Sequence, residues 1–133
     1  RGLALYKAMV ASKEYEAKGP LYKAMEVMDG ALRMYGTSGL ALAFNGGKDA
    51  TVMLHLVRAC TAGFLAMEHG EGWAADCDAK GTKMAVACAY FVDGSAFKEL
   101  EDFVLEMESE CSLSVLRVQG GYKEGCRKVT EEL

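Results

Sequence analysis

The chain has 133 residues, of which 51% are hydrophobic and 26% are charged, and its formal net charge is −4 at pH 7. These values are typical of one globular domain of ordinary size. The acidic balance, the scattered basic residues and the lack of a long uninterrupted apolar stretch argue against nucleic-acid and membrane partners.

The sequence contains an odd number of cysteines, with irregular spacing and no CxxC pair. This arrangement argues against a disulfide framework and against a zinc knuckle, and no residues are predicted to ligate a metal. We expect ordinary thiols in a reducing compartment and therefore a cytoplasmic location. The cysteines are Cys60, Cys77, Cys88, Cys111 and Cys126.

The first 36 residues predict a helical extension. Residues 3–18 predict one helix that ends at Gly19-Pro20, because glycine tolerates a left-handed C-terminal turn and proline suits the next helix's first turn. Apolar residues at helical spacing predict the second helix, namely Leu21, Met25, Met28 and Leu32. Since the chain starts at Arg1 and ends inside a predicted helix, we expect a piece of a longer protein.

The remainder alternates between apolar strands and helices. Strands are predicted at 40–44, 84–92 and 113–118. Helices are predicted at about 49–60, after a cap at Ser95 with Phe97, Leu100, Val104 and Met107 on one face, and from 122 onward. The glycine-rich segment 63–82 predicts an exposed excursion.

Strands separated by helices predict parallel pairing and hence a three-layer α/β/α fold. We expect a helical extension at 1–36 and a partial α/β domain at 37–133 that is truncated after its third strand. In such sheets, ligands bind beyond the carboxyl ends of the strands. The segments 45–50 and Asp93-Gly94 both follow predicted strands, so they are expected to line one site.

The loop after the first strand has the chemistry of a phosphate-binding turn. Gly46 and Gly47 lack β-carbons, so backbone amides can approach phosphate oxygens. The following helix presents its N–H groups and the positive end of its dipole, and Lys48 adds a positive charge. Thr51 can offer a hydroxyl, and Asp49 can cap the helix or help to hold Mg²⁺. The alternative is a plain strand-to-helix turn capped by Asp49. The spacing fits neither a Walker A loop nor a dinucleotide fingerprint.

The string Asn45-Gly46-Gly47-Lys48-Asp49 resembles the SGGKDS loop of the PP-loop ATP pyrophosphatase superfamily. With its flanks, AFNGGKDATVMLHLVRA, it is most similar to eukaryotic-type FAD synthetases, the FMN adenylyltransferases of the phosphoadenylyl-sulfate reductase-like family. The segments YFVDGSAFKELEDFVLEM and CSLSVLRVQGGYKEG resemble that family's second and third strands with their following turns. The resemblance covers about residues 30–133.

This resemblance implies an enzyme that transfers AMP from ATP to FMN and releases pyrophosphate, with Mg²⁺ bridging the phosphates. ATP and FMN would be substrates and FAD the flavin product. Asn45, Lys48 and Asp49 would be the catalytic residues. The nucleotide site would comprise Phe44, Asn45, Gly46, Gly47, Lys48, Asp49, Thr51, the backbone of Tyr90, Phe91 and Val92, and the residues Asp93 and Phe97.

Two departures from the family pattern leave alternatives open. Ala50 replaces the usual Ser or Cys, and the family's later flavin-binding segments would lie beyond Leu133. We therefore expect half a site and self-association through the truncated sheet. The alternatives are a sulfonucleotide reductase or another adenylating PP-loop enzyme, and a non-catalytic adenine-nucleotide-binding module.

Other chemistry-bearing residues have plainer readings. His55 is expected to be a core or boundary histidine, and Cys126 a structural cysteine. The excursion with Trp73 is expected to be a tolerated insertion rather than a lid whose tryptophan stacks on flavin. A solvated helix face rather than a metal site is expected for the acidic residues Glu99, Glu101, Asp102, Glu106 and Glu108.

Overall fold

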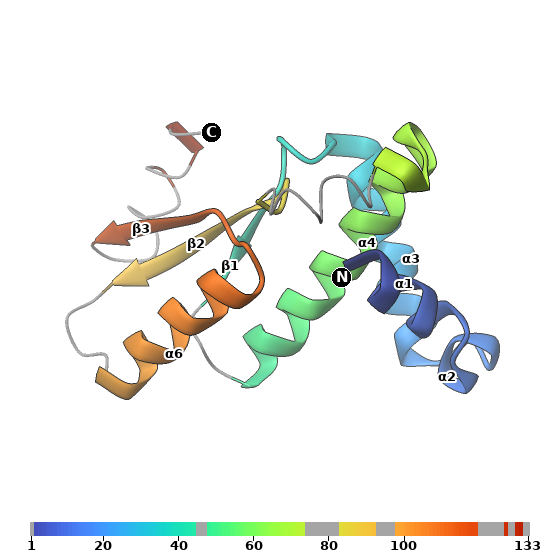
Figure 1. Cartoon of the computed structure of the whole chain (residues 1–133), viewed down its shortest axis with the longest axis horizontal. Coiled ribbons are helices and arrows are strands. Elements are labelled where there is room, and N and C mark those ends of the chain that lie inside the picture. Colours follow the sequence, from blue (N-terminus) through green and yellow to red (C-terminus); the bar gives the residue numbers. More distant parts are fainter. Residues whose placement is uncertain are drawn as a thin grey trace.

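The molecule contains a three-stranded parallel sheet flanked by helices (Figure 1). The computed structural model describes residues 2–44, 48–73, 83–92 and 98–119, together with residues 127, 130 and 131. The strands pair in the order β1 (Ala41–Ala43), β2 (Ala87–Val92) and β3 (Val115–Gln119). Both pairings are parallel. The predicted α/β class and the parallel pairing are therefore confirmed.

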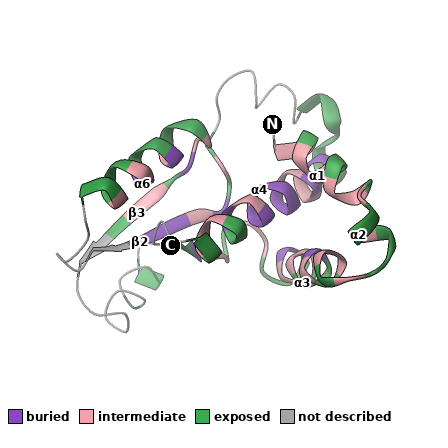
Figure 2. Cartoon of the chain, turned by 90° about the horizontal axis from the view of Figure 1, so that it is seen from below, coloured by how far each residue is buried: buried purple, intermediate pink, exposed green. Residues whose placement is uncertain are grey.

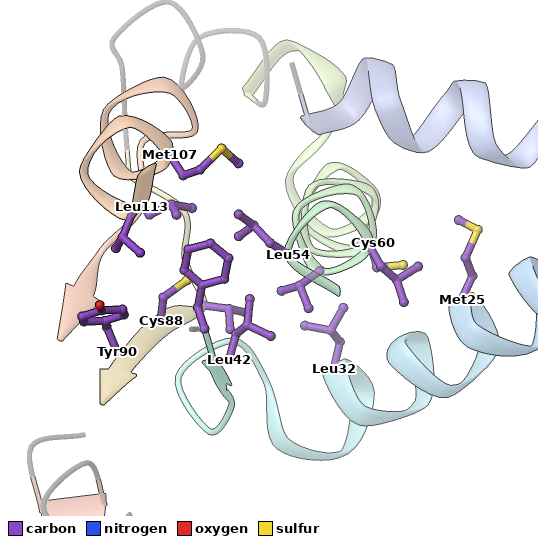
Figure 3. Packing of buried hydrophobic residues seen from close by; sticks show 14 residues of the cluster. Met25, Leu32, Leu42, Leu54, Cys60, Cys88, Tyr90, Met107 and Leu113 are labelled. Carbon is purple, nitrogen blue, oxygen red and sulfur yellow. The ribbon is translucent and has the colours of Figure 1, made fainter. Parts of the chain in front are cut away.

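The helices that connect the strands, α4 (Lys48–His69) and α6 (Lys98–Glu110), lie against the same face of the sheet (Figures 1 and 3). Leu42 and Phe44 alternate with the exposed residues Ala41 and Ala43, so the larger side chains point toward the helices. The buried cluster that results contains Leu54 of α4 and Val104 of α6. This packing holds the carboxyl ends of the strands in fixed positions.

Helix α4 is longer than the predicted helix at 49–60, and the predicted excursion is wrong for residues 63–69. It spans 22 residues, and eight of them are buried. It packs against α1, α3 and β1, and Figure 2 shows buried residues along most of its length. Contacts on several sides explain its apolar composition.

The sequence predicts no apolar stretch long enough to cross a membrane. By length and composition alone, however, α4 is long and apolar enough to do so. That finding is weak evidence, because the core helix of a globular domain passes the same test. The burial of α4 against other helices and the sheet accounts for its composition here.

The N-terminal extension contains three helices rather than two. Helix α1 (Gly2–Val10) ends before Ser12, whose side chain caps α2 (Lys13–Glu16) by accepting the Tyr15 N–H at 3.3 Å. The predicted helix at 3–18 is therefore broken in the middle, because a serine at the N-cap satisfies an amide that would otherwise lack a partner. Helix α3 (Pro20–Tyr35) starts at the predicted proline.

The extension packs on α4, which settles where it lies. Helices α1 and α3 both contact α4, and Met25 and Leu32 of α3 join the common buried cluster (Figure 3). Helix α1 approaches α4 closely at Gly63, where an added β-carbon would meet ring carbons of Tyr6 at 2.8–2.9 Å. This glycine therefore allows a tyrosine of α1 to lie against the middle of α4.

Replacing Gly63 with alanine is expected to lower the free energy of unfolding by about 1–3 kcal/mol, because the new methyl group overlaps the Tyr6 ring. Gly30→Ala is the matched control, since Gly30 also lies within a helix and its β-carbon site is open. The control should raise stability by about 0.5–1 kcal/mol through helix propensity. Equilibrium urea unfolding compares the two, and equal effects would contradict the described packing of α1.

Element boundaries differ from the predictions in smaller ways. The first two strands are shorter than predicted, while Val104 and Met107 of α6 are buried on the predicted face. The acidic residues of α6 are largely exposed as predicted, although Glu108 is partly buried and bonds Arg117 at 3.1 Å. The predicted helix from 122 onward lies largely outside the described residues.

The described thiols differ in accessibility. Cys60 and Cys88 are buried, and burial raises the pKa of each thiol from 9.0 to about 11, with smaller contributions from Asp29 for Cys60 and from Cys111 for Cys88. Cys111 is partly exposed. Of these three, we expect only Cys111 to react with a maleimide at pH 7 in the folded protein.

The raised thiol pKa values also predict a loss of stability in alkali. The unfolded chain ionises near pH 9, whereas the folded chain keeps both thiols neutral until about pH 11. The stabilisation is therefore fully present below pH 9 and is lost as the pH rises from 9 to 11. Urea unfolding of the wild type and of a Cys60→Ala, Cys88→Ala variant should show a steeper decline for the wild type. Parallel curves would contradict the buried state of these thiols.

Candidate functional site

The candidate site begins where β1 ends and α4 starts. Phe44 is 1% exposed, and its N–H donates to the Ala89 carbonyl of β2 at 2.9 Å. Lys48 is the first residue of α4, so three residues connect a buried strand end to a helix start. These residues, Asn45, Gly46 and Gly47, lie outside the described part of the chain. Their predicted contacts with phosphate stay predictions.

The first turn of α4 presents polar side chains at this end of the sheet. Lys48 and Asp49 are exposed, whereas Thr51 is partly buried. The N-terminus of a helix leaves backbone N–H groups without intrahelical partners and carries partial positive charge. The start of α4 can therefore bind an anion, with Lys48 adding a full positive charge. Asp49 in the first turn is favourably placed for the helix dipole.

Strand β2 extends past the end of β1, which defines a second part of the site. The register between them ends at the pair Ala43 and Ala89, whereas β2 remains paired with β3 up to Val92. Backbone groups alternate in direction along a strand. Because the Ala89 carbonyl points to β1, the N–H and C=O of Phe91 point to the same side, beyond the register of β1.

This alternation sharpens the prediction for residues 90–92. The Cys88 N–H donates to Ser114 next to β3, so the backbone groups of Tyr90 and Val92 also point toward β3. The Tyr90 side chain is 4% exposed and belongs to the buried cluster (Figure 3). Of the three predicted residues, Phe91 therefore has the backbone groups that face the site.

The remaining predicted residues of this edge lie outside the described residues. Strand β2 ends at Val92 and α6 begins at Lys98, so Asp93 and Phe97 flank these two elements in the sequence without being described. Their assignment to the nucleotide cleft stays a prediction.

His55 fits the structural reading. It is partly buried two turns into α4, and its Nδ1 accepts a hydrogen bond from a guanidinium NH₂ of Arg58 at 2.8 Å. Burial and, to a smaller extent, the Arg58 charge lower the pKa of His55. A neutral imidazole that accepts from arginine is a boundary residue that fixes the Arg58 side chain.

Trp73 lies at the other end of α4 from the candidate site. Its ring packs against His69, with centroids 4.5 Å apart, just after the last turn of the helix. A 22-residue helix is about 33 Å long, which separates this tryptophan from Lys48. The described residues 70–73 therefore lie far from the first turn of α4, and this position does not support stacking of Trp73 on a ligand bound there.

The site thus combines an anion-binding helix start, a lysine and an edge of backbone groups. The alternating direction of backbone groups along β2 singles out Phe91 as the residue whose N–H and C=O face the site. The sequence predicts this role for Tyr90, Phe91 and Val92 together. Register could not be read from the sequence, because it depends on where β1 ends. The arrangement can bind phosphate near Lys48 and a planar hydrogen-bonding group near Phe91.

No family model matches the chain. A probable FAD synthase of Caenorhabditis briggsae is 26% identical over 119 residues, which make up 90% of this chain and 20% of that protein. The chain therefore spans about a fifth of the length of this curated relative.

Solved structures share the fold. Candida glabrata FMN adenylyltransferase matches with a TM-score of 0.59 in its complex with FMN and the ATP analogue AMPCPP, and 0.61 in its complex with FAD and pyrophosphate. Yeast FAD synthetase in complex with FAD matches with a TM-score of 0.60. Each match covers 98% of this chain at 17% identity, and the chain spans 44% of the two C. glabrata chains and 46% of the yeast chain.

Proposed function

We propose that this chain forms the ATP-binding part of an FMN adenylyltransferase, which transfers AMP from ATP to FMN and yields FAD and pyrophosphate. One observation carries the proposal. The segment Asn45-Gly46-Gly47 joins the buried end of β1 to the N-terminus of α4, with Lys48 and Asp49 in the first helical turn. The names of the relative and of the structures that share the fold support the choice of FMN as acceptor.

In the proposed reaction, a phosphate oxygen of FMN attacks the α-phosphorus of ATP. A new P–O bond joins the two nucleotides, and the bond from the α-phosphorus to the bridging oxygen breaks, so that pyrophosphate leaves with the electron pair. The first turn of α4 and Lys48 would stabilise the charge that develops on the leaving group. Positioning and charge neutralisation supply most of the catalysis in such transfers.

The adenine ring fits the edge of β2 beyond β1. Phe91, two residues after Ala89, offers its backbone N–H as a donor and its C=O as an acceptor to a planar base. We propose that these groups bind the adenine edge. Recognition by backbone groups would not depend on the side chain at this position.

We also propose that Mg²⁺ accompanies ATP. The exposed carboxylate of Asp49 is an oxygen ligand of the kind that Mg²⁺ prefers. Within the described ranges, no group of three His, Cys, Asp or Glu side chains could hold a metal by itself. Bound Mg²⁺ would neutralise phosphate charge, and most of its ligands would come from ATP and water.

Two finer assignments belong to the same proposal. The string Gly46-Gly47-Lys48-Asp49 supports membership of the PP-loop ATP pyrophosphatases and, within them, of the phosphoadenylyl-sulfate reductase-like family. The odd number of cysteines supports a reducing, cytoplasmic location.

Incubation of the full-length protein with FMN, Mg²⁺ and ATP labelled at the α-phosphate tests the proposal. Labelled FAD and pyrophosphate should form in equal amounts. ATP binding without cleavage in the presence of FMN would favour a non-catalytic nucleotide-binding module. Turnover of a sulfonucleotide but not of FMN would favour a reductase, and either result would refute the proposed reaction.

A further inference from the structure

Helix α3 carries large apolar side chains on its outward face. Val27 is 71% exposed and Met34 is 73% exposed, although α3 buries Met25 and Leu32 on its other side. Figure 2 shows this helix with exposed residues along its outer side. Gly30 lies between the two apolar residues in sequence, and a β-carbon there would meet nothing within 4 Å. A glycine in the interior of an exposed helix lowers helix stability by about 1 kcal/mol relative to alanine, so the glycine at position 30 needs an explanation.

Helical geometry arranges the outward face in three strips. With 3.6 residues per turn, Val27, Gly30 and Met34 form the middle strip. Glu26 and Arg33 lie along one flank, and both are exposed. The other flank carries partly exposed Ala24 and Tyr35, and the latter is 59% exposed.

We propose that two copies of this chain associate through α3, in antiparallel orientation about a two-fold axis at Gly30. Antiparallel pairing brings each flank against the same flank of the second copy. Because the axis passes at Gly30, two residues of different copies lie at the same height along the helices when their numbers sum to about 60. Val27 then meets Met34 of the second copy, and the reciprocal contact follows from symmetry. Glycine at the axis allows the two backbones to approach.

The flanks are complementary to themselves in this arrangement. Glu26 lies at the level of Arg33 of the second copy. The two-fold axis repeats this contact, so each dimer contains two Glu26–Arg33 ion pairs. Tyr35 lies over Ala24 of the second copy, so a large side chain meets a small one. A parallel pair would instead place Glu26 near an apolar flank and would form no ion pair.

The intrahelical salt bridge of Arg33 does not conflict with this pairing. Its Nε contacts Asp29 at 3.0 Å, and the guanidinium has two NH₂ groups that can donate to a second carboxylate. Lys23 would lie near the C-terminus of the second copy's helix, where the dipole favours a cation. Charge, shape and dipole therefore select the same orientation.

The expected affinity is modest. Helix α3 has 16 residues and is about 24 Å long, so the contact would fall at the small end of specific interfaces. We expect dimers at concentrations of tens to hundreds of micromolar, roughly as for weak interfaces of this size. This surface differs from the sheet edge, where the sequence predicted self-association.

Charge-reversal variants of the full-length protein test the proposal by sedimentation velocity. Glu26→Arg alone and Arg33→Glu alone each place like charges together and should raise the dimer Kd at least about tenfold. Mixed in equal amounts, the two variants should associate with each other, because every flank pair is again of opposite charge. Glu106→Arg, on an exposed position of α6, is the matched control and should not change the dimer Kd.

Circular dichroism should show unchanged helix content, since the substituted side chains are exposed. A wild type that stays monomeric up to several hundred micromolar would overturn the proposal. So would a dimer that withstands both reversals, which would indicate association through the sheet or another surface. Two variants that remain monomeric after mixing would also overturn it.

Discussion

Replacing Phe44 with alanine is expected to lower the free energy of unfolding by about 3–5 kcal/mol. Phe44 is among the largest fully buried side chains, and it packs in the cluster that joins β1, α4 and α6. Its removal would leave a cavity in the cluster that also contains Leu54 and Val104, at the end of the strand that positions the loop. The loss would be a large fraction of the stability of an ordinary domain.

Equilibrium urea unfolding of the purified protein measures this change. Phe44→Leu should cost less than about 1.5 kcal/mol, because it keeps most of the buried volume. Val52→Ala is the control on the first turns of α4, and its effect should stay within about 0.5 kcal/mol, since Val52 is 64% exposed. A change below 1 kcal/mol for Phe44→Ala would show that this residue is not part of a packed core.

Replacing Lys48 with alanine is expected to weaken ATP binding about 10- to 150-fold, without a comparable loss of stability. A charge-assisted hydrogen bond contributes about 1.5–3 kcal/mol, and Lys48 adds a full charge to the partial charge of the helix N-terminus. Its exposure in the first turn of α4 means that folding does not depend on it.

Isothermal titration calorimetry of the full-length protein with AMPCPP provides the measurement. Lys48→Arg should retain most of the affinity, because it keeps the charge. Lys13→Ala on α2 is the matched control, since this exposed lysine lies in another helix, and its affinity should equal that of the wild type. An unchanged affinity of Lys48→Ala for AMPCPP would show that the phosphates do not bind at the start of α4.

Local patterns predicted the parts of the fold that depend on neighbouring residues. The short apolar run at 40–44 and the apolar helix that follows identified the junction of β1 and α4. Pro20 marked the start of α3, and Val104 and Met107 marked the buried face of α6. In each case the pattern is local, and burial in the structure follows the same pattern.

Other features depend on contacts that local patterns do not contain. Gly63 resembled a loop residue, but its lack of a side chain serves the packing of Tyr6 against α4. The break at Ser12 depends on a cap that competes with a continuous helix. The role of Phe91 depends on where β1 ends relative to β2. These features required the structure because they arise from tertiary packing and strand register.

A crystal structure of the full-length protein with AMPCPP and Mg²⁺ tests the central claim most directly. We predict phosphate oxygens roughly 3 Å from the N–H groups at the start of α4 and from Lys48 Nζ, with the adenine edge at a similar distance from the Phe91 N–H and C=O. A nucleotide bound elsewhere, for example near Trp73 at the far end of α4, would contradict the account.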